Sequence, residues 1–443
     1  MSDSAGIEGS SYHGIDIHMA RDSSIGSAGS SDGIGIECCI FRVPLSLSKT
    51  NQMAWQPDMI PIGPYHHGKL EFQEIEEHKR RFSINLLSRT NQGSDKLQHF
   101  VEALKPMEQK IRRCYFKALP FNSDELIKMM IVDGCFIIEL FCKYCCGWTG
   151  HTNPEHDPLL RQPWILPFLM RDLIKLENQI PWFILECLFD LTLGSCNESH
   201  PSLSSLTMNF FNHILQIPED SELLMKKFSD REGEHLLNLL RLTLIPDSPE
   251  TKQAPNKFLH LIQPAKNLHR TGLKFKPISS GSFLDIKFIN GVLEIPVLRL
   301  DDFLSSLFLN FIAFEQCHRA SSKHVSAYAV FMACLLNRPA DARLLCDCKI
   351  LENYFGTDEN IIYFFSNIGK DLVFDVSKNY LSRVFHDVNV YSENKWRVQW
   401  ADFKNTYFST RWSLISAAAA FMLLVLTTLQ TFFAVYAYYR PPS

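Results

Sequence analysis

Two adjacent histidines, His66 and His67, lie between a Gly-Pro pair and a charged segment in the stretch PIGPYHHGKLEF. Adjacent imidazoles in a polar loop could bind a metal, act as a general base, or belong to a turn that begins a helix. Neighbouring side chains diverge by about 100° on a helix and point in opposite directions on a strand, so the pair is poorly placed to hold one metal. Since no acidic or cysteine partner lies at a motif-like spacing, we expect a structural role for both histidines.

Buried carboxylates are the second group of side chains that could carry chemistry. A carboxylate with a perturbed pKa in a cleft can act as a general acid or base. The interpretation that we favour is that these groups cap helices or pair with Arg and Lys inside the protein. In the stretch LENQIP, for example, polar side chains lie between two apolar helices, where they could bind the exposed backbone groups of helix ends. The residues concerned are Asp133, Glu139, Asp172 and Glu177, with Asn178 and Gln179 beside the last of them.

One segment gathers cysteine and histidine, the side chains that Zn²⁺ prefers as ligands. Cys142, Cys145 and Cys146 precede His151 and His156. The gap between the cysteines and the histidines is much shorter than in a zinc finger, and CKYCC continues an apolar helix, so we expect structural thiols there. Phosphate-binding, dinucleotide-binding and H-E-x-x-H motifs are missing from the sequence. We therefore expect no metal, no cofactor and no catalytic residue, that is, a protein that is not an enzyme.

The elements that position these side chains are predicted to be mainly helical. Apolar residues recur at helical spacing after the His-His turn, and Ser123 is placed to cap the apolar run that follows it. Pro181 fits the first turn of another helix, where its missing N–H costs nothing. The predicted helices cover about 70–86, 124–146, 165–177, 181–191, 203–215, 234–244, 300–318 and 323–337.

A small β-hairpin is predicted within 283–298, because Asn290-Gly291 separates two alternating runs. Pro296 cannot donate a ladder hydrogen bond, so we expect its strand at the edge of a sheet. The expected cross-strand pairs are Phe288–Leu293, Ile286–Ile295 and Leu284–Val297 on the apolar face and Lys287–Glu294 on the other face.

Composition is that of an ordinary folded protein. The 443 residues are 46% hydrophobic and carry a net charge of −4, which gives no reason to expect nucleic acid as a partner. Residues 1–36 are rich in Ser and Gly and are predicted to be disordered, and 37–400 are predicted to form one large helical domain. Without a secretory signal peptide, we expect the thirteen cysteines to be reduced.

The end of the sequence contains an uncharged apolar run, Leu414 to Tyr436, that is long enough to cross a hydrocarbon core of about 30 Å. We predict a transmembrane helix over 412–439, in contact with membrane lipid, and hence a tail-anchored, single-pass membrane protein. Basic residues lie mostly on the N-terminal side of the span, which places the domain in the cytosol. The plasma membrane is favoured over the endoplasmic reticulum. The alternative, an outward-facing domain, would be revealed by glycosylation at Asn197.

Segments in a fixed order resemble the plant DUF (domain of unknown function) 247 family over nearly the whole chain after residue 36. They are RVPLSL at Arg42, PIGPYHHG at Pro61, EEHKRRF at Glu76, MMIVDGCFIIEL at Met129, RDLIKLENQIPWFIL at Arg171, PAKNLHRTGLKFK at Pro264, NGVLEIPVL at Asn290 and NFIAFEQ at Asn310. Departures are small, such as Trp55 where the family often has Tyr. The family-motif residues of unknown role are Gly63, Pro64, His66, His67, Asp133, Glu177, Asn178, Gln179, Glu315 and Gln316.

The resemblance implies a plant-specific protein, membrane-anchored at its C-terminus, in a family with no established catalytic activity. Some members are implicated as pollen-side determinants of self-incompatibility in grasses, which suggests recognition or signalling. We therefore expect a non-catalytic interaction or signalling module with an unknown protein partner. The alternative is an unrecognised membrane-bound enzyme that uses the buried carboxylates or the His66/His67 pair.

Overall fold

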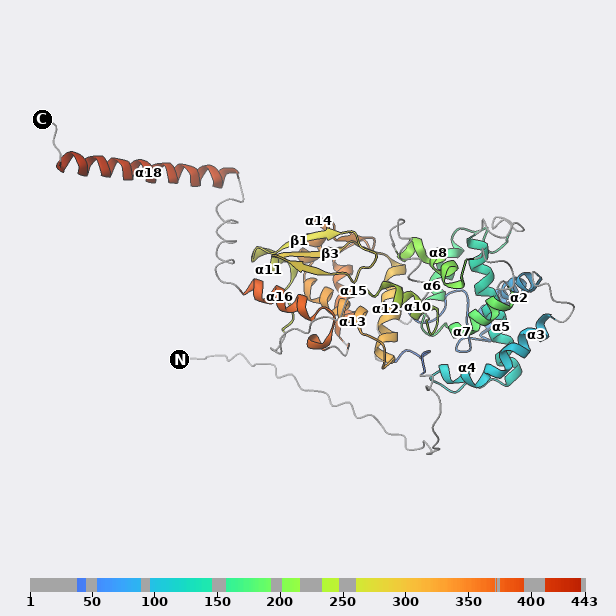
Figure 1. The fold of residues 1–443 in the computed structure, drawn as a ribbon. Helices are drawn as coiled ribbons and strands as arrows, with labels where there is room; N and C mark the ends of the chain where they lie inside the picture. The colour runs from blue at the N-terminus through green and yellow to red at the C-terminus, as the bar shows by residue number, and fades with distance from the viewer. Residues whose placement is uncertain are drawn as a thin grey trace, which may run out of the picture. The chain divides into compact units, whose positions relative to one another are not determined.

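A computed structural model of the chain divides into two units, 1–36 and 37–443, and the first lies outside the residues that the structure describes. The predicted disorder of 1–36 is therefore not tested. The described residues are 38–44, 54–88, 96–145, 157–192, 201–215, 233–246, 260–370, 372, 375–393 and 411–439. They form a mainly α-helical structure with a few short strands (Figure 1), as the sequence predicted.

The first part of the domain is built around α5, the long apolar helix, which packs against α2, α3, α7 and α8. Most of the side chains of α5 are buried. Its N-cap is Asn122, which accepts from the backbone N–H of Glu125 while the Glu125 carboxylate accepts from the N–H of Asn122. The prediction of Ser123 as the cap was therefore wrong by one residue. The helices of this part are α2 (Gln73–Ser88), α3 (Lys96–Leu104), α4 (Glu108–Cys114) and α5 (Ser123–Tyr144).

A loop that follows α6 carries the LENQIP segment. The helix predicted over 165–177 ends at Leu173. The Gln179 side chain donates to the carbonyl of Leu173, and the N–H of Leu176 donates to the Asn310 side chain instead of to a helical carbonyl. Helix α7 begins directly after this loop. Pro181, at the end of the loop, pairs with His235, and helix α10 begins at the next residue. The elements are α6 (Ile165–Leu173), α7 (Trp182–Thr192), α8 (Leu203–Leu215) and α10 (Leu236–Leu244).

The second part of the domain packs helices against two small sheets. One sheet has the strand order β1-β3-β2, and the other pairs β4 with β5 in parallel. The strands are β1 (Lys274–Ile278), β2 (Lys287–Ile289), β3 (Val292–Pro296), β4 (Leu298–Leu300) and β5 (Leu351–Asn353). The helices are α11 (Ala265–Arg270), α12 (Asp302–Cys317), α13 (His324–Leu335), α14 (Pro339–Asp347), α15 (Asp358–Lys370) and α16 (Ser382–Ser392).

The predicted hairpin is confirmed in its turn and in the pairs Phe288–Leu293 and Lys287–Glu294. The predicted pairs Ile286–Ile295 and Leu284–Val297 do not form, because β2 begins at Lys287. Asn290 and Gly291 both have positive φ, 50° and 83°, and Phe288 lies opposite Leu293. The expectation of an edge strand was wrong, because β3 is the central strand and pairs in parallel with β1 as well as with β2. Pro296 is its last residue and lies beyond the part that pairs with β2. Glu294 lies opposite Lys287 in register, and its carboxylate also binds Lys276 of β1 at 2.8 Å.

The turn of this hairpin is covered by α16. A Cβ on Gly291 would lie 2.5 Å from the ring of Tyr391, so only glycine allows this approach. The same tyrosine ring meets Phe288 edge-on, with 5.6 Å between ring centroids. The last helix of the domain is thus fixed on the β-hairpin.

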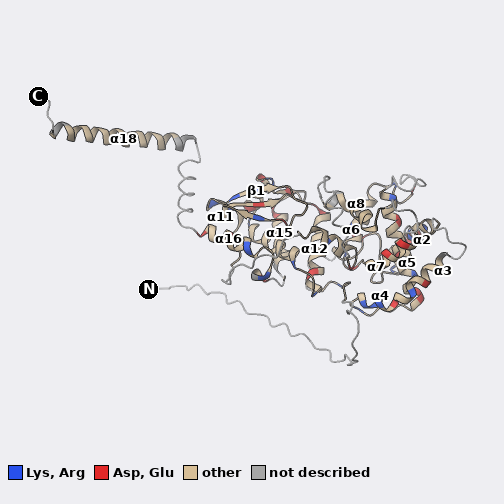
Figure 2. Cartoon of the chain, viewed as in Figure 1, with Lys and Arg blue, Asp and Glu red and all other residues tan. Residues whose placement is uncertain are grey.

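Helix α18 (Arg411–Tyr439) contains a 22-residue stretch, Ile415–Tyr436, that is long and apolar enough to cross a membrane. Its mean hydropathy is 2.0, and none of that stretch is buried against other residues. Lys, Arg, Asp and Glu residues are spread over the helices and strands of the domain, whereas none lies within the apolar stretch of α18 (Figure 2). The eleven cysteines within the described ranges are all free, as expected for reduced thiols.

Candidate functional site

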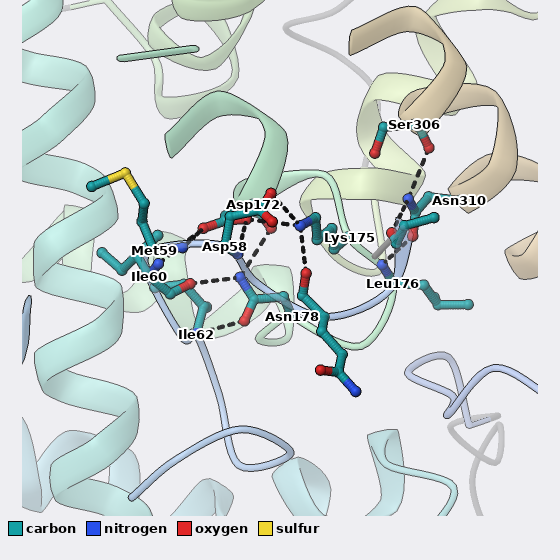
Figure 3. A network of polar contacts seen from close by, with 12 residues as sticks. Asp58, Met59, Ile60, Ile62, Asp172, Lys175, Leu176, Asn178, Ser306 and Asn310 are labelled. Carbon is teal, nitrogen blue, oxygen red and sulfur yellow. Dashed lines mark hydrogen bonds and ion pairs between the residues drawn. The ribbon is translucent and has the colours of Figure 1, made fainter. Parts of the chain in front are cut away.

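A buried polar network joins the loop that contains IGPYHH to the loop that contains LENQIP (Figure 3). Its centre is Asp172 at the end of α6, whose carboxylate accepts from the backbone N–H groups of Asp58, Met59 and Ile60 at 2.7–2.9 Å. Nζ of Lys175 lies 3.0 Å from the same carboxylate and 2.8 Å from that of Asp58. Burial raises the pKa of Asp172, and the Lys175 charge and the three N–H groups oppose that rise.

Two amides of LENQIP complete the junction by binding backbone groups. Asn178 accepts from the N–H of Ile62 at 2.7 Å and donates to the carbonyl of Ile60 at 3.0 Å. Gln179 donates to the carbonyl of Leu173, the last residue of α6, at 2.7 Å, and accepts from the N–H of Leu237 in α10 at 3.0 Å. The expectation that these side chains bind helix-end groups is confirmed.

Asn310 of α12 extends this network to the second part of the domain. Its side chain accepts from the N–H of Leu176 at 2.8 Å and donates to the carbonyls of Ala54 and Ser306 at 3.1 and 2.8 Å. Both N–H groups and the oxygen of this amide therefore bind backbone groups, as Figure 3 shows for the residues that it labels.

Asp133 of α5 holds the turn at Gly63. Its Oδ2 accepts from the N–H of Gly63 at 2.7 Å, and its Oδ1 lies 2.6 Å from Nζ of Lys79. Lys79 also donates to the carbonyl of Pro61 at 2.8 Å. Gly63 has a φ of +72°, and a Cβ there would lie 2.6 Å from the carbonyl oxygen of Gln179. Burial raises the pKa of Asp133, against the opposing charge of Lys79.

The pair Glu315 and Gln316 serves α13. The Glu315 carboxylate accepts from the N–H groups of Val325 and Ser326 at 3.0 and 2.7 Å, in the first turn of that helix, and from Nε of Arg241 at 3.0 Å. Gln316 donates to the hydroxyl of Ser326 at 3.1 Å. Glu139, the remaining buried carboxylate, lies 3.9 Å from Lys143.

The two histidines are separated by the structure. His67 is exposed and meets the ring of Phe121 edge-on, whereas His66 is only 2% exposed. Nε2 of His66 lies 3.6 Å from Oε2 of Glu177, and neither ring nitrogen has a hydrogen-bond partner among the described residues. Glu177 also accepts from the N–H of Val43 at 2.8 Å.

Arg42 closes this corner from the solvent side. Its side chain is 40% exposed, and Nη1 lies 3.7 Å from Oε2 of Glu177. Nη2 donates to the carbonyl of Tyr65 at 2.9 Å, and the guanidinium lies over the ring of that tyrosine. Within the described ranges, His66 is thus a family-motif residue whose two ring nitrogens lack hydrogen-bond partners beside the ion pair of Arg42 and Glu177.

Of the cysteine and histidine residues within 142–156 that the sequence singled out as possible metal ligands, two lie within the described ranges. Cys142 is buried in α5, and Cys145 donates to the carbonyl of Leu206. The remaining three, Cys146, His151 and His156, lie outside the described residues.

A different group of possible metal ligands was missed by the sequence reasoning. Cys39, Glu234 and His235 each offer one ligand atom, and these atoms all lie within 4.8 Å of one another. The backbone N–H of Cys39 donates to the carbonyl of Cys114, whose thiol donates to the carbonyl of Lys110 at 3.3 Å. No spacing rule could have found the group of possible ligands, because its members come from two segments far apart in the sequence. The adjacent cysteines at the start of the domain were the available signal.

Comparisons with known proteins cover most of the chain. A family described as plant protein of unknown function matches residues 40–426. A UPF0481 protein of Arabidopsis thaliana is 35% identical over 425 residues, which is 90% of this chain and 87% of that relative. A putative UPF0481 protein of the same plant is 24% identical over 494 residues, with 90% of each chain covered. No solved structure matches.

Proposed function

The chain belongs to the plant DUF 247 family, and from that premise we propose that it is a single-pass membrane protein whose helical domain is a non-catalytic interaction or signalling module. The observation that carries the proposal is α18, because a long helix with no buried face and no internal charge needs an apolar solvent around it. A helix that belonged to the core of a soluble domain would be buried instead.

Helix α18 also satisfies its own polar groups, as a helix in hydrocarbon must. The hydroxyl of Thr427 donates to the carbonyl of Leu423 at 2.7 Å, and that of Thr431 donates to the carbonyl of Thr427 at 2.8 Å. As a helix, the 22-residue stretch is about 33 Å long at about 1.5 Å per residue. That length supports the plasma membrane, whose core is about 32–33 Å thick, over the thinner endoplasmic reticulum.

Flanking charge supports a cytosolic domain. Lys395, Arg397, Lys404 and Arg411 precede the apolar stretch, and Arg440 follows it. Cytoplasmic flanks carry the excess of Lys and Arg, so we assign the N-terminal side of α18 to the cytosol. On this topology Asn197 stays unmodified.

Support for a non-catalytic domain comes from the buried carboxylates. A general base needs a lone pair directed at a substrate. The oxygens of Asp172, Asp133 and Glu315 are instead bonded to backbone N–H groups and to Lys or Arg. These contacts fix loops and helix ends, which is the arrangement that an interaction surface needs beneath it.

The alternative, a membrane-bound enzyme, is favoured by one observation. His66 is buried beside the Glu177 carboxylate with both ring nitrogens unpartnered, and the partly exposed Arg42 lies next to them. An imidazole beside a carboxylate is the arrangement of a general base. The two functions separate by substitution, because a turnover lost on His66→Ala or Glu177→Gln would exclude the non-catalytic proposal.

The anchoring is tested by expressing the full chain and a chain that ends at residue 410 in plant cells. We expect the full chain to stay in the membrane pellet after alkaline extraction and the shorter chain to appear in the soluble fraction. An acceptor sequon placed after Arg440 should be glycosylated while Asn197 is not; the reverse pattern would overturn the orientation.

The interaction role is tested by proximity labelling from the membrane-inserted full chain. The labelled set is compared between the parent chain and a variant that keeps α18 but carries substitutions on the surface of the domain. Proteins labelled by the parent chain and not by the variant would support the interaction module. A labelled set that is identical to that of α18 alone would contradict it.

A further inference from the structure

We propose that Cys39, Glu234 and His235 form a binding site for Zn²⁺. Three segments meet at this point. The chain around Cys39 pairs with the end of α4, since the N–H groups of Cys39 and Ile40 both donate to the carbonyl of Cys114, at 3.1 and 2.9 Å. Glu234 accepts through its backbone carbonyl from the N–H of Trp182 at 2.8 Å, and His235 is the N-cap of α10.

The separations of the side chains fit a small contraction around a metal. One atom each of Cys39, Glu234 and His235 lies within 4.8 Å of the others. Tetrahedral Zn²⁺, with bonds of about 2.0–2.3 Å, places its ligand atoms about 3.3–3.8 Å apart. Side-chain movements of about 1 Å therefore suffice. Three protein ligands leave the fourth position of a tetrahedral Zn²⁺ to a water molecule, as at open zinc sites.

Surrounding polar groups orient the proposed ligands, as is usual at metal sites. Oε2 of Glu234 accepts from the side-chain amide of Asn238 at 3.2 Å, and Oε1 lies 3.3 Å from Nε2 of His318. His318 is 5% exposed, and its Nδ1 has no hydrogen-bond partner among the described residues. A buried imidazole is thus directed at the carboxylate without being fully satisfied.

His235 must exchange one contact to bind the metal. Its Nδ1 accepts from the backbone N–H of Asn238 at 3.3 Å, and its Nε2 lies 3.2 Å from the carbonyl oxygen of Cys39. Both contacts are longer than the usual 2.9–3.0 Å, so either is replaced by a metal bond at small cost. The remaining ring nitrogen then keeps a backbone partner that fixes the ring.

A disulfide between Cys39 and Cys114 is the competing use of the two thiols. It would need neither the carboxylate nor the imidazole that lie within reach of Cys39. One sulfur with one nitrogen and one oxygen is a ligand set that suits Zn²⁺. The chemistry of the whole group therefore favours the metal over the disulfide.

The test uses the full chain in detergent, purified with a thiol reductant and stripped with a chelator. Titration with Co²⁺ is followed by the thiolate-to-metal charge-transfer band, and displacement by Zn²⁺ is followed by the loss of that band. We expect one metal per chain. Cys39→Ser should lose the band, and His318→Ala should weaken binding about 10–100-fold. Cys187→Ser and Cys346→Ser, which change partly buried thiols outside the group, should bind like the parent protein.

Two measurements keep the test independent of misfolding in the variants. X-ray absorption on the zinc-loaded parent protein should show a shell of one sulfur and three nitrogen or oxygen atoms, and Zn²⁺ should raise its Tm but not that of Cys39→Ser. A shell without sulfur, a parent protein that binds no metal, or stoichiometric metal in Cys39→Ser would each overturn the proposal. A Cys39–Cys114 disulfide in protein isolated with its thiols blocked would do the same.

Discussion

Nζ of Lys175 lies 3.0 Å from the Asp172 carboxylate, and both side chains are completely shielded from solvent. Since neither charge is hydrated, each depends on the other and on the backbone groups around them. These two residues join α6 to the loop at 58–60, which directly precedes the family-motif segment that begins at Pro61.

The first prediction concerns this pair. Lys175→Met leaves the Asp172 carboxylate buried beside N–H groups only, and we expect the free energy of unfolding to fall by about 3–5 kcal/mol. Denaturant unfolding of the full chain measures the change. Lys276→Gln removes an ion pair whose lysine is 61% exposed, so it should cost less than about 1 kcal/mol. Equal losses in the two variants would contradict the role given to burial.

The second prediction compares two glycines with the same backbone conformation. Gly63 and Gly68 have φ of +72° and +78°, but a Cβ meets the carbonyl oxygen of Gln179 at 2.6 Å only at Gly63. Gly68→Ala should cost about 1–2 kcal/mol, the strain of a left-handed residue. Gly63→Ala should cost clearly more, because backbone must move as well. Thermal unfolding of both variants checks the order, and a smaller loss at Gly63 would refute it.

The third prediction concerns pH. Burial, followed by the charge of Arg241, lowers the pKa of His324 from 6.5 to about 4. Between these values the unfolded chain binds a proton that the folded chain does not, so stability is lost as the pH falls from 6.5 towards 4. The loss from this residue is at most about 3 kcal/mol. His324→Phe keeps the stacking on Tyr380 and should flatten the dependence, whereas His67→Asn, at an exposed site, should leave it unchanged.

The fourth prediction tests His66 as a structural residue. Its ring nitrogens are buried without partners, a condition that costs about 1–3 kcal/mol. His66→Leu should therefore leave the free energy of unfolding unchanged or raise it. A loss above about 1 kcal/mol would show that the imidazole has a partner that stabilises the fold. Chemical denaturation at pH 7.5 makes the comparison.

The fifth prediction tests α18 as a span. Leu424→Arg and Leu426→Arg lie near the centre of the apolar stretch. Together the two arginines raise the free energy of membrane insertion by about 5–7 kcal/mol. We expect most of that double variant to leave the membrane pellet on alkaline extraction. Tyr439→Arg places a charge at the helix end and should be retained. Retention of both would contradict the proposed anchor.

Local signals in the sequence predicted much of the fold. The Asn290-Gly291 turn and its register follow from two adjacent residues, and the long helix α5 follows from its apolar run. The parallel pairing of β1 with β3 was missed, because the local sequence pattern of a strand does not indicate which distant strand it pairs with. The helix predicted over 165–177 is shorter in the structure, because the side-chain amides of Gln179 and Asn178 in the following loop donate to the last carbonyls of α6.

The candidate site shows the same division. That the carboxylates and amides of LENQIP bind helix ends could be inferred from their position between apolar runs. Which groups they bind could not, since Asp172 contacts residues 112–114 positions away. The Cys39 group was missed for the same reason, because its members meet only after the N-terminal segment pairs with the end of α4.

The contact between Tyr391 and Gly291 has a mechanical consequence. Since α16 is the last described helix before α18 in the chain, tension from a membrane-held α18 reaches the domain first at α16. There it acts on the tyrosine ring that covers the hairpin turn, so the β-hairpin bears the load before the buried network around Asp172 does.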